Sequence, residues 1–197
     1  MKRVFFAIGV LAIAGGVYAQ PKEQSQGWKV DNNHTSIAFS VPHMVISEVT
    51  GNFKDFTINV KSSKPDFTDL SVDASIKVAS ISTDNEMRDN HLKSDDFFNA
   101  AKFPNITFKS AAVEKTGKNT YKIIGNLTIR DITKKVTFDA VYKGSIKSMT
   151  GQTIAAWSVN AVINRFDYGL KWNKLIESGG MVVGDQVSIS MNVEMDK

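Results

Sequence analysis

The chain has 197 residues, a formal net charge of +4 and no cysteine. This length is enough to bury one sizeable hydrophobic core in a single domain. The charge is nearly balanced and forms no basic stripe along any predicted element, which argues against a nucleic-acid partner. The absence of cysteine excludes thiol catalysis, cysteine-ligated zinc and disulfide exchange.

The first residues, 1–19, have the three-part layout of a secretory signal peptide. Lys2 and Arg3 precede an apolar run from Val4 to Val17, and Ala19 ends a small-residue cleavage site. A membrane anchor is the alternative, but this run is shorter than the roughly 20 residues that a spanning helix needs. We therefore expect cleavage near Ala19, a periplasmic or secreted protein and no stable membrane insertion. Residues 20–26 form a polar lead-in, and residues 27–197 are expected to form one domain.

Beyond the lead-in, most of the chain alternates between apolar and polar residues. The regular run from Leu70 to Val78 puts Leu70, Val72, Ala74, Ile76 and Val78 on one face and polar residues between them. Such one-sided alternation predicts antiparallel strands with one wet face. We count about eight such strands, joined by short turns. The sequence therefore predicts an all-β fold, an eight-stranded antiparallel barrel, because closure removes exposed edges. A β-sandwich fits the same strand count.

One stretch, Arg88 to Pro104, does not follow the strand pattern. Its apolar residues are closer to a helical period, and Thr83, Asp84 or Asn85 can cap a helix before it. Pro104 would stop that helix. We predict a short helical insert near residues 85–99 whose Phe97–Phe98 pair forms a lid on the barrel.

The histidines offer no local metal site. His34, His43 and His91 are too far apart in sequence for the usual two-histidine spacing. Three alternatives remain for the histidines. They hydrogen-bond as polar groups near the barrel mouth, they contact a ligand, or they form a three-histidine metal site across the fold. No nucleophile elbow, zinc-protease pair or phosphate-binding loop is present. We predict no catalytic residue, no metal and no cofactor.

Two arginines follow strand-like runs. Arg165 either pairs with Asp167 or, with Asn164, supplies hydrogen-bond donors at a pocket mouth. Arg130 is expected to pair at the surface with Asp131 or Asp139. A short helical run is also predicted from 173 to 178.

Six blocks of sequence, in order, resemble the YceI-like family of lipocalin-like, polyisoprenoid-binding proteins. One block opens the domain between Trp28 and His43, and another holds the insert. The motifs that carry the resemblance are Trp28-x-Val30-Asp31-x-x-His34-Thr35-x-Ile37-x-Phe39-x-Val41-x-His43, Gly51-x-Phe53, Asp89-x-His91-Leu92-Lys93-Ser94-x-Asp96-Phe97-Phe98-Asn99, Gly125-Asn126-Leu127-Thr128-Ile129-Arg130, Asn164-Arg165-x-Asp167-Tyr168-Gly169 and Gly184-Asp185-x-Val187-x-Ile189. Asp131 departs from the family, which often has glycine there.

The resemblance implies a lipocalin-like barrel whose elongated apolar cavity holds a polyisoprenoid or another long-chain, fatty-acid-like lipid, in an exported protein without known enzymatic chemistry. Together with the alternation, it gives a set of apolar cavity residues: Phe39, Leu70, Val72, Ile76, Val78, Phe108, Ile123, Leu127, Phe138, Trp157 and Ile189. The polar head group of the lipid is expected at His34, His43, Asn164 and Arg165.

Two other functions remain open at this point. An enzyme acting on an isoprenoid would use His34, His43 or Asp167. A partner-binding β-domain would have a filled interior instead of a cavity. The sequence leaves the natural lipid and the oligomeric state open, with a homodimer among the alternatives.

Overall fold

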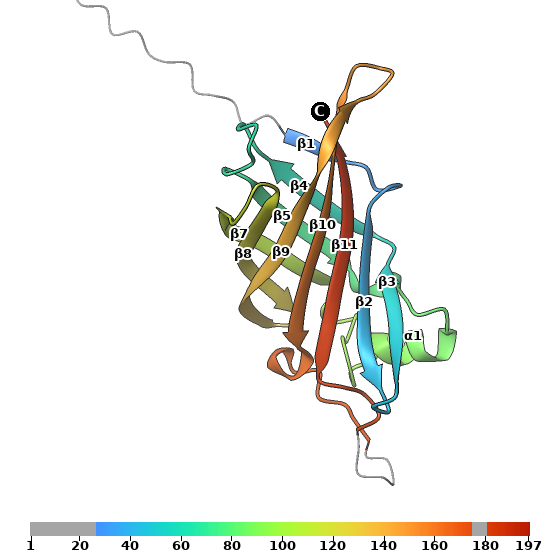
Figure 1. Cartoon of the computed structure of the whole chain (residues 1–197). Coiled ribbons are helices and arrows are strands. Elements are labelled where there is room, and N and C mark those ends of the chain that lie inside the picture. The colour runs from blue at the N-terminus through green and yellow to red at the C-terminus, as the bar shows by residue number, and fades with distance from the viewer. Residues whose placement is uncertain (1–26, 175–180) are drawn as a thin grey trace, which may run out of the picture.

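The computed structural model describes residues 27–174 and 181–197 (Figure 1). The predicted signal peptide and the polar lead-in lie outside the described residues. Most of the helical run predicted from 173 to 178 lies outside them too, and Asn173 and Lys174 are not helical.

The described residues form antiparallel strands and a few short helices. The strands are β1 (Gly27–Val30), β2 (Ser36–His43), β3 (Ser47–Phe53), β4 (Phe56–Lys61), β5 (Ser71–Lys77), β6 (Ile81–Ser82), β7 (Asn105–Lys115), β8 (Thr120–Ile129), β9 (Ile132–Lys147), β10 (Thr153–Asn164) and β11 (Gln186–Asp196). The helices are α1 (Glu86–Lys93) and the single turns η1 (Val78–Ser80) and η2 (Arg165–Tyr168).

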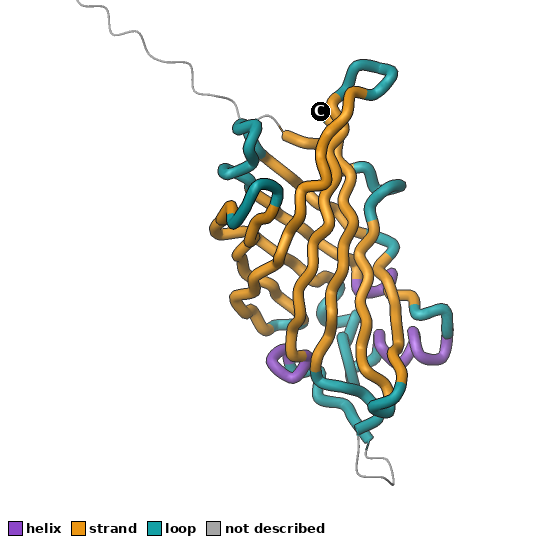
Figure 2. Tube along the Cα trace, in the orientation of Figure 1, coloured by secondary structure: helices purple, strands orange, loops and turns teal. Residues whose placement is uncertain are grey.

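These strands close into the predicted eight-stranded barrel. The ring runs β1-β4-β5-β7-β8-β9-β10-β11, and pairing between β1 and β11 closes it. Strands β2, β3 and β6 continue the wall beyond the ring, because β2 pairs with residues 188–192 of β11 and β3 pairs with β2 and β6. Strands β1 and β2 are successive parts of one bent strand. The same holds for β3 and β4, and for β5 and β6 (Figure 2). The prediction of an all-β antiparallel barrel is confirmed.

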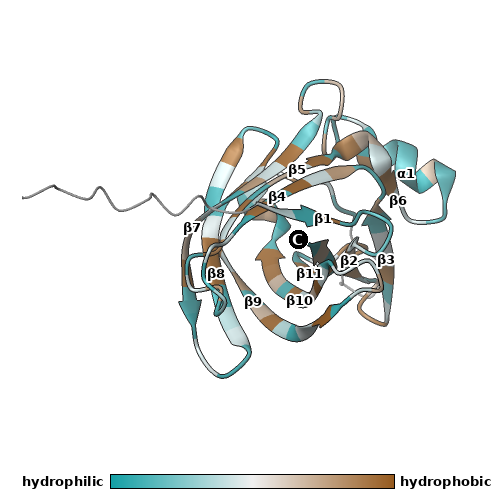
Figure 3. Ribbon diagram, turned by 90° about the horizontal axis from the view of Figure 1, so that it is seen from above, coloured by the Kyte–Doolittle hydropathy of each residue, from teal (hydrophilic) through white to brown (hydrophobic). Residues whose placement is uncertain are grey.

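The alternation along each strand decides which side chains face inward. On β5, Ala74 and Ile76 are buried while Ser71, Asp73 and Lys77 are exposed. Hydrophobic side chains accordingly pack inside the barrel, and hydrophobic and hydrophilic residues follow one another along the strands (Figure 3).

Packed aromatic rings close the barrel at the β1 end. Phe67 lies in the left-handed backbone region, and its ring centroid is 5.5 Å from that of Trp28 and 5.1 Å from those of Tyr142 and Trp157. Tyr121 joins the group, with its ring centroid 5.1 Å from that of Trp157. These aromatic side chains therefore pack against one another and fill the interior at this end.

The helical insert is shorter than predicted. Helix α1 begins after Asn85, whose side chain accepts a hydrogen bond from the backbone N–H of Arg88 at 3.0 Å. It ends at Lys93, well before Pro104, so the prediction that the proline stops the helix is wrong. Turns follow instead, because the N–H of Phe98 donates back to the carbonyl of Leu92. These turns carry the Phe97–Phe98 pair to the barrel.

Within residues 27–174 and 181–197, no helix has both the length and the apolar character needed to cross a membrane.

Candidate functional site

The barrel encloses a cavity of about 220 Å³. Its walls are hydrophobic side chains from β2 to β5 and β7 to β11, joined by Leu92, Phe97 and Phe98 of the insert. Arg165 is the one charged residue among the lining residues that the structure describes. The insert thus contributes directly to the cavity wall, as its predicted role as a lid requires.

The predicted cavity residues lie together, with one exception. Ten of them line the cavity: Phe39, Leu70, Val72, Ile76, Phe108, Ile123, Leu127, Phe138, Trp157 and Ile189. Val78 does not line it, because the strand changes into the turn η1 at this residue. Its side chain is 1% exposed and packs in the core instead. Side chains stop alternating between the two faces where the strand becomes a helical turn. The apolar and polar alternation in the sequence does not show where this change occurs.

Two glycines make room for aromatic rings of the cavity wall. A Cβ atom on Gly51 would lie 2.4 Å from the ring of Phe39, and one on Gly125 would lie 2.5 Å from the ring of Phe108. Both distances are too short for real atoms, so glycine at each position lets a phenylalanine ring pack flat across the neighbouring strand.

The cavity is elongated along β11. Its lining includes every second residue of that strand, namely Val187, Ile189, Met191, Val193 and Met195. With a rise of about 3.3 Å per residue, these side chains extend over about 26 Å. Of these five residues, only Ile189 was predicted from the sequence to line the cavity. The length suits an extended chain better than a compact ligand.

Arg165 lies at the end of the cavity away from the aromatic cluster. It is 3% exposed, and its guanidinium group donates to four backbone carbonyls. These belong to Gly184 at 2.7 Å, Trp172 at 2.9 Å, Val183 at 3.1 Å, and Leu170. Burial lowers the pKa of Arg165, and the nearby Asp185 carboxylate opposes this. No Arg165–Asp167 ion pair is found between the described side chains, so that predicted pairing is wrong.

Asn164 and His43 lie at the same end of the barrel as Arg165. The side chain of Asn164 accepts from the N–H of Phe166 at 2.9 Å and donates to Asp185 at 3.3 Å, so it caps η2. His43 ends β2 and forms a backbone bridge with Val183. Neither residue lines the cavity.

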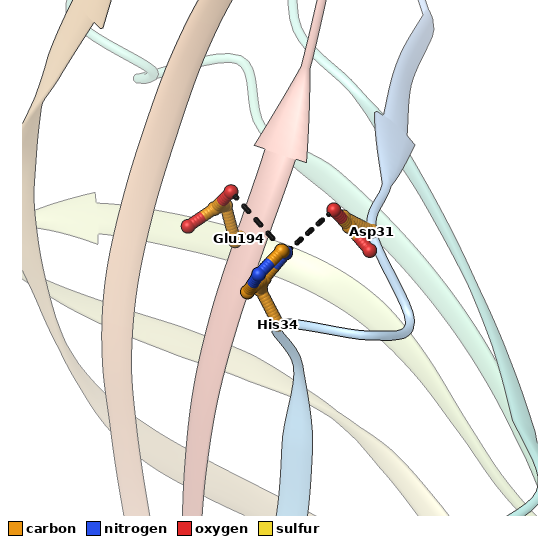
Figure 4. A group of neighbouring side chains, drawn as sticks. All are labelled: Asp31, His34 and Glu194. Carbon is orange, nitrogen blue, oxygen red and sulfur yellow. Dashed lines mark hydrogen bonds and ion pairs between the residues drawn. The ribbon is translucent and has the colours of Figure 1, made fainter.

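His34 lies beside Asp31 and Glu194 (Figure 4). Its Nδ1 atom is 2.8 Å from an oxygen of Asp31 and 3.9 Å from an oxygen of Glu194. Glu194 is nine residues along the chain from Asp185, and Asp185 is the residue that lies near Arg165. An extended strand covers about 30 Å over nine residues. One lipid head group cannot contact both ends, so the grouping of His34 with the other three is wrong.

The Asp31, His34 and Glu194 side chains offer ligand atoms within 4.8 Å of one another, close enough to hold a cation. The same geometry is explained by an ion pair. The hydrogen bond to Asp31, followed by the charges of Asp31 and Glu194, raises the pKa of His34. The hydrogen bond from His34 is also the main cause that lowers the pKa of Asp31.

Arg130 also has partners other than those predicted. It adopts φ +57° in the two-residue turn between β8 and β9. Its guanidinium group donates to the carbonyl of Phe97 at 3.1 Å and lies over the ring of Phe103. Arg130 therefore fixes the insert against the barrel, and no pairing with Asp131 or Asp139 is found among the described ion pairs.

The barrel, the apolar cavity and the insert match a known domain family. The family model for the YceI-like domain matches residues 28–195. The chain belongs to the YceI-like family. A UPF0312 protein of Staphylococcus aureus (strain N315) is 38% identical over 165 residues, which cover 83% of this chain and 94% of that protein.

Several solved structures show the same fold. The Campylobacter jejuni YceI protein is 34% identical and superposes with a TM-score of 0.69 over 79% of this chain and 89% of that chain. Burkholderia cenocepacia BcnA superposes with a TM-score of 0.74 at 23% identity, covering 84% of this chain and 99% of that chain. A polyisoprenoid-binding domain from Saccharophagus degradans superposes with a TM-score of 0.60 at 11% identity, covering 87% and 98% of the two chains.

Proposed function

We propose that this YceI-like protein binds one long-chain lipid, a polyisoprenoid or a chain of similar length, inside its barrel, and that it carries or stores this lipid after export. The observation that supports the proposal most is the cavity itself, because its described lining is hydrophobic except for Arg165. A protein with a filled core has no such space, since natural interiors contain few voids larger than a water molecule.

The chemistry of the walls favours a ligand that is mostly hydrocarbon. A polar ligand would lose its hydrogen bonds to water on entering, and burial of an unpaired polar group costs several kcal/mol. The guanidinium group of Arg165 already donates to four carbonyls, so it has little capacity left for a ligand. The polar head group of the lipid should therefore stay outside the apolar lining, at the end of the cavity beside His43 and the η2 turn.

The similarity to the Saccharophagus degradans polyisoprenoid-binding domain supports an isoprenoid as the tail. The length of the lining along β11, about 26 Å, agrees with an extended tail. A branched isoprenoid chain and an unbranched acyl chain both bury apolar surface, so the choice between them depends on how well the chain fills the cavity.

We propose a binding role rather than catalysis. His34, His43 and Asp167 were the candidates for acid–base chemistry, and none of the three lines the cavity. His34 lies with Asp31 and Glu194 near the opposite end of β11 from Asp167. A general acid or base must come within hydrogen-bond reach of the reacting group, and these residues do not converge on one point.

Rebinding of lipid to the delipidated protein tests the proposal. Intrinsic fluorescence provides the signal, because Trp157 lines the cavity. We expect a long polyprenol to bind far more tightly than a short isoprenoid alcohol with the same head group. The variant Ala74→Phe fills space at a lining position and should weaken polyprenol binding by about tenfold or more.

The matched control is Ala112→Phe, which adds the same volume at an exposed position of β7 and should bind normally. Equal affinities for the long and the short alcohol, or no binding of either, would contradict the proposal.

A further inference from the structure

The cavity lining extends to the end of the barrel where β2 meets the segment before β11. Val41 on β2 and Val183 line the cavity there and are half-buried. His43 forms a backbone bridge with Val183, which holds the two segments together. The opposite end is filled by the ring cluster of Trp28, Phe67 and their neighbours.

Hydrophobic side chains project into solvent beside this opening. Met44, Val45 and Ile46 form the turn between β2 and β3, with 42%, 75% and 90% of their surface exposed. Met181 is 39% exposed and is next to Val182, whose carbonyl accepts a 3.0 Å hydrogen bond from the N–H of Met44. We call these four residues the apolar tip. Figure 1 shows the β2–β3 turn at one extremity of the barrel, opposite the β9–β10 turn.

The backbone holds the tip in a conformation that these residues disfavour. Met44 has φ +49° and Val45 has φ +68°. Non-glycine residues are uncommon in this region, and a β-branched residue there is a true outlier. Asparagine or glycine would adopt these positive φ values at a lower energetic cost, and neither would expose a large hydrophobic side chain to water. Both the strain and the exposure are unfavourable in water, a combination that suggests a function for the turn.

We propose that the apolar tip inserts into the surface of a lipid bilayer, so that a lipid passes between the bilayer and the cavity without crossing water. This inference rests on the proposed function, because it supplies the route by which the lipid enters. Two features favour a bilayer over a protein partner. Three of the four tip residues form a short turn at an extremity of the barrel rather than a broad face (Figure 1), and the tip lies close in sequence to the lining residues Val41 and Val183.

The barrel has a second exposed hydrophobic turn that serves as an internal comparison. Ile146 is 68% exposed near the end of β9, and Met149 in the β9–β10 turn is fully exposed. Neither residue lines the cavity. If hydrophobic exposure alone drove membrane binding, this turn would contribute as much as the apolar tip.

Flotation with phosphatidylcholine vesicles tests the inference on the full-length processed protein. We expect the wild type to float with the vesicles. Ile46→Ser should weaken this association by about ten- to hundredfold, the change that corresponds to losing the burial of one isoleucine side chain. Val45→Asn should also weaken it, although asparagine relieves the strain at φ +68° and should melt no lower than the wild type. Ile146→Ser is the matched control and should float like the wild type.

A second measurement separates docking from lipid binding. Polyprenol delivered from cyclodextrin, without a membrane, should bind the wild type and Ile46→Ser equally, whereas uptake from vesicles should be slow only in Ile46→Ser. A wild type that floats but binds no polyprenol would contradict the proposed function and leave the docking inference intact.

Three results would overturn the inference. The first is a wild type that does not float with the vesicles. The second is an equal reduction of flotation by Ile46→Ser and Ile146→Ser. The third is an Ile46→Ser variant that loses a dimer seen by sedimentation but floats unchanged. The last result would assign the tip to contact with a second copy of the chain.

Discussion

Replacement of Arg165 by leucine should destabilise the fold far more than it changes the choice of lipid head group. The guanidinium group donates to the carbonyls of Leu170, Trp172, Val183 and Gly184. It therefore joins η2, the segment that follows it and the segment before β11. Leucine has a similar apolar stem but no donor, so the variant leaves all four carbonyls without their partner.

The cost follows from those four bonds. A buried acceptor left unpaired costs about 1–3 kcal/mol, and some of the four carbonyls will find water instead. We expect a loss of about 3–5 kcal/mol in the free energy of unfolding, near the upper limit for single substitutions. For a domain of this size that loss lowers the melting temperature by roughly 6–20 °C. Arg165→Lys, which keeps the charge and some donors, should lose less.

Thermal melting with chemical denaturation measures the loss, and binding of a neutral polyprenol and its pyrophosphate measures the ligand effect. Our reasoning predicts that any weakening of binding is equal for the two lipids. A variant that melts like the wild type but loses affinity only for the pyrophosphate would refute it. Arg165 would then be a head-group ligand, as the sequence suggested.

Three further predictions concern other parts of the chain. Ile76→Asp places a carboxylate at a cavity position that is 8% exposed, so we expect a loss of several kcal/mol in unfolding free energy or the loss of lipid uptake; normal melting and uptake together would contradict the assigned face. His34→Ala should lower the melting temperature most at pH values between 3.8 and 6.5, the ordinary pKa values of Asp31 and His34. The raised pKa of His34 stabilises the fold below pH 6.5, and this stabilisation fades as the pH rises through the folded-state pKa of His34. The lowered pKa of Asp31 stabilises the fold above pH 3.8, and this stabilisation fades as the pH falls through the folded-state pKa of Asp31. A difference in melting temperature between variant and wild type that does not change with pH would count against the ion pair. The exported protein should begin at Gln20, which its intact mass will show, and a membrane-bound form that keeps residues 1–19 would contradict this.

Local patterns in the sequence were enough to predict the barrel and most of the cavity wall. Alternation along the run that contains β5 identified Leu70, Val72 and Ile76 as inward-facing, because a half-buried strand buries one face only. The same reasoning failed at Val78, where the backbone turns into η1 and the period of two no longer applies. It also overestimated α1, because the turns after Lys93 are fixed by backbone hydrogen bonds that leave no periodic signal.

The polar contacts depended on tertiary structure and could not be predicted in the same way. The carbonyl partners of Arg165 come from segments without regular periodicity, up to 19 residues away in the chain. His34 and Arg165 both adjoin strands, but which end of the barrel each occupies depends on how the strands pair. The pairing of β11 with β1 and β2 places His34 beside Glu194, and the pairing of β10 with β11 places Arg165 beside Gly184.

The central claim is that the cavity holds one long lipid chain, and native mass spectrometry of the exported protein as purified tests it most directly. We predict a species heavier than the polypeptide by the mass of one lipid, which extraction removes and added polyprenol restores. In Ala74→Phe this species should be strongly reduced, whereas Ala112→Phe should retain it. A protein that carries no lipid on isolation and gains none from added polyprenol would contradict the account, as would equal loading of the two variants.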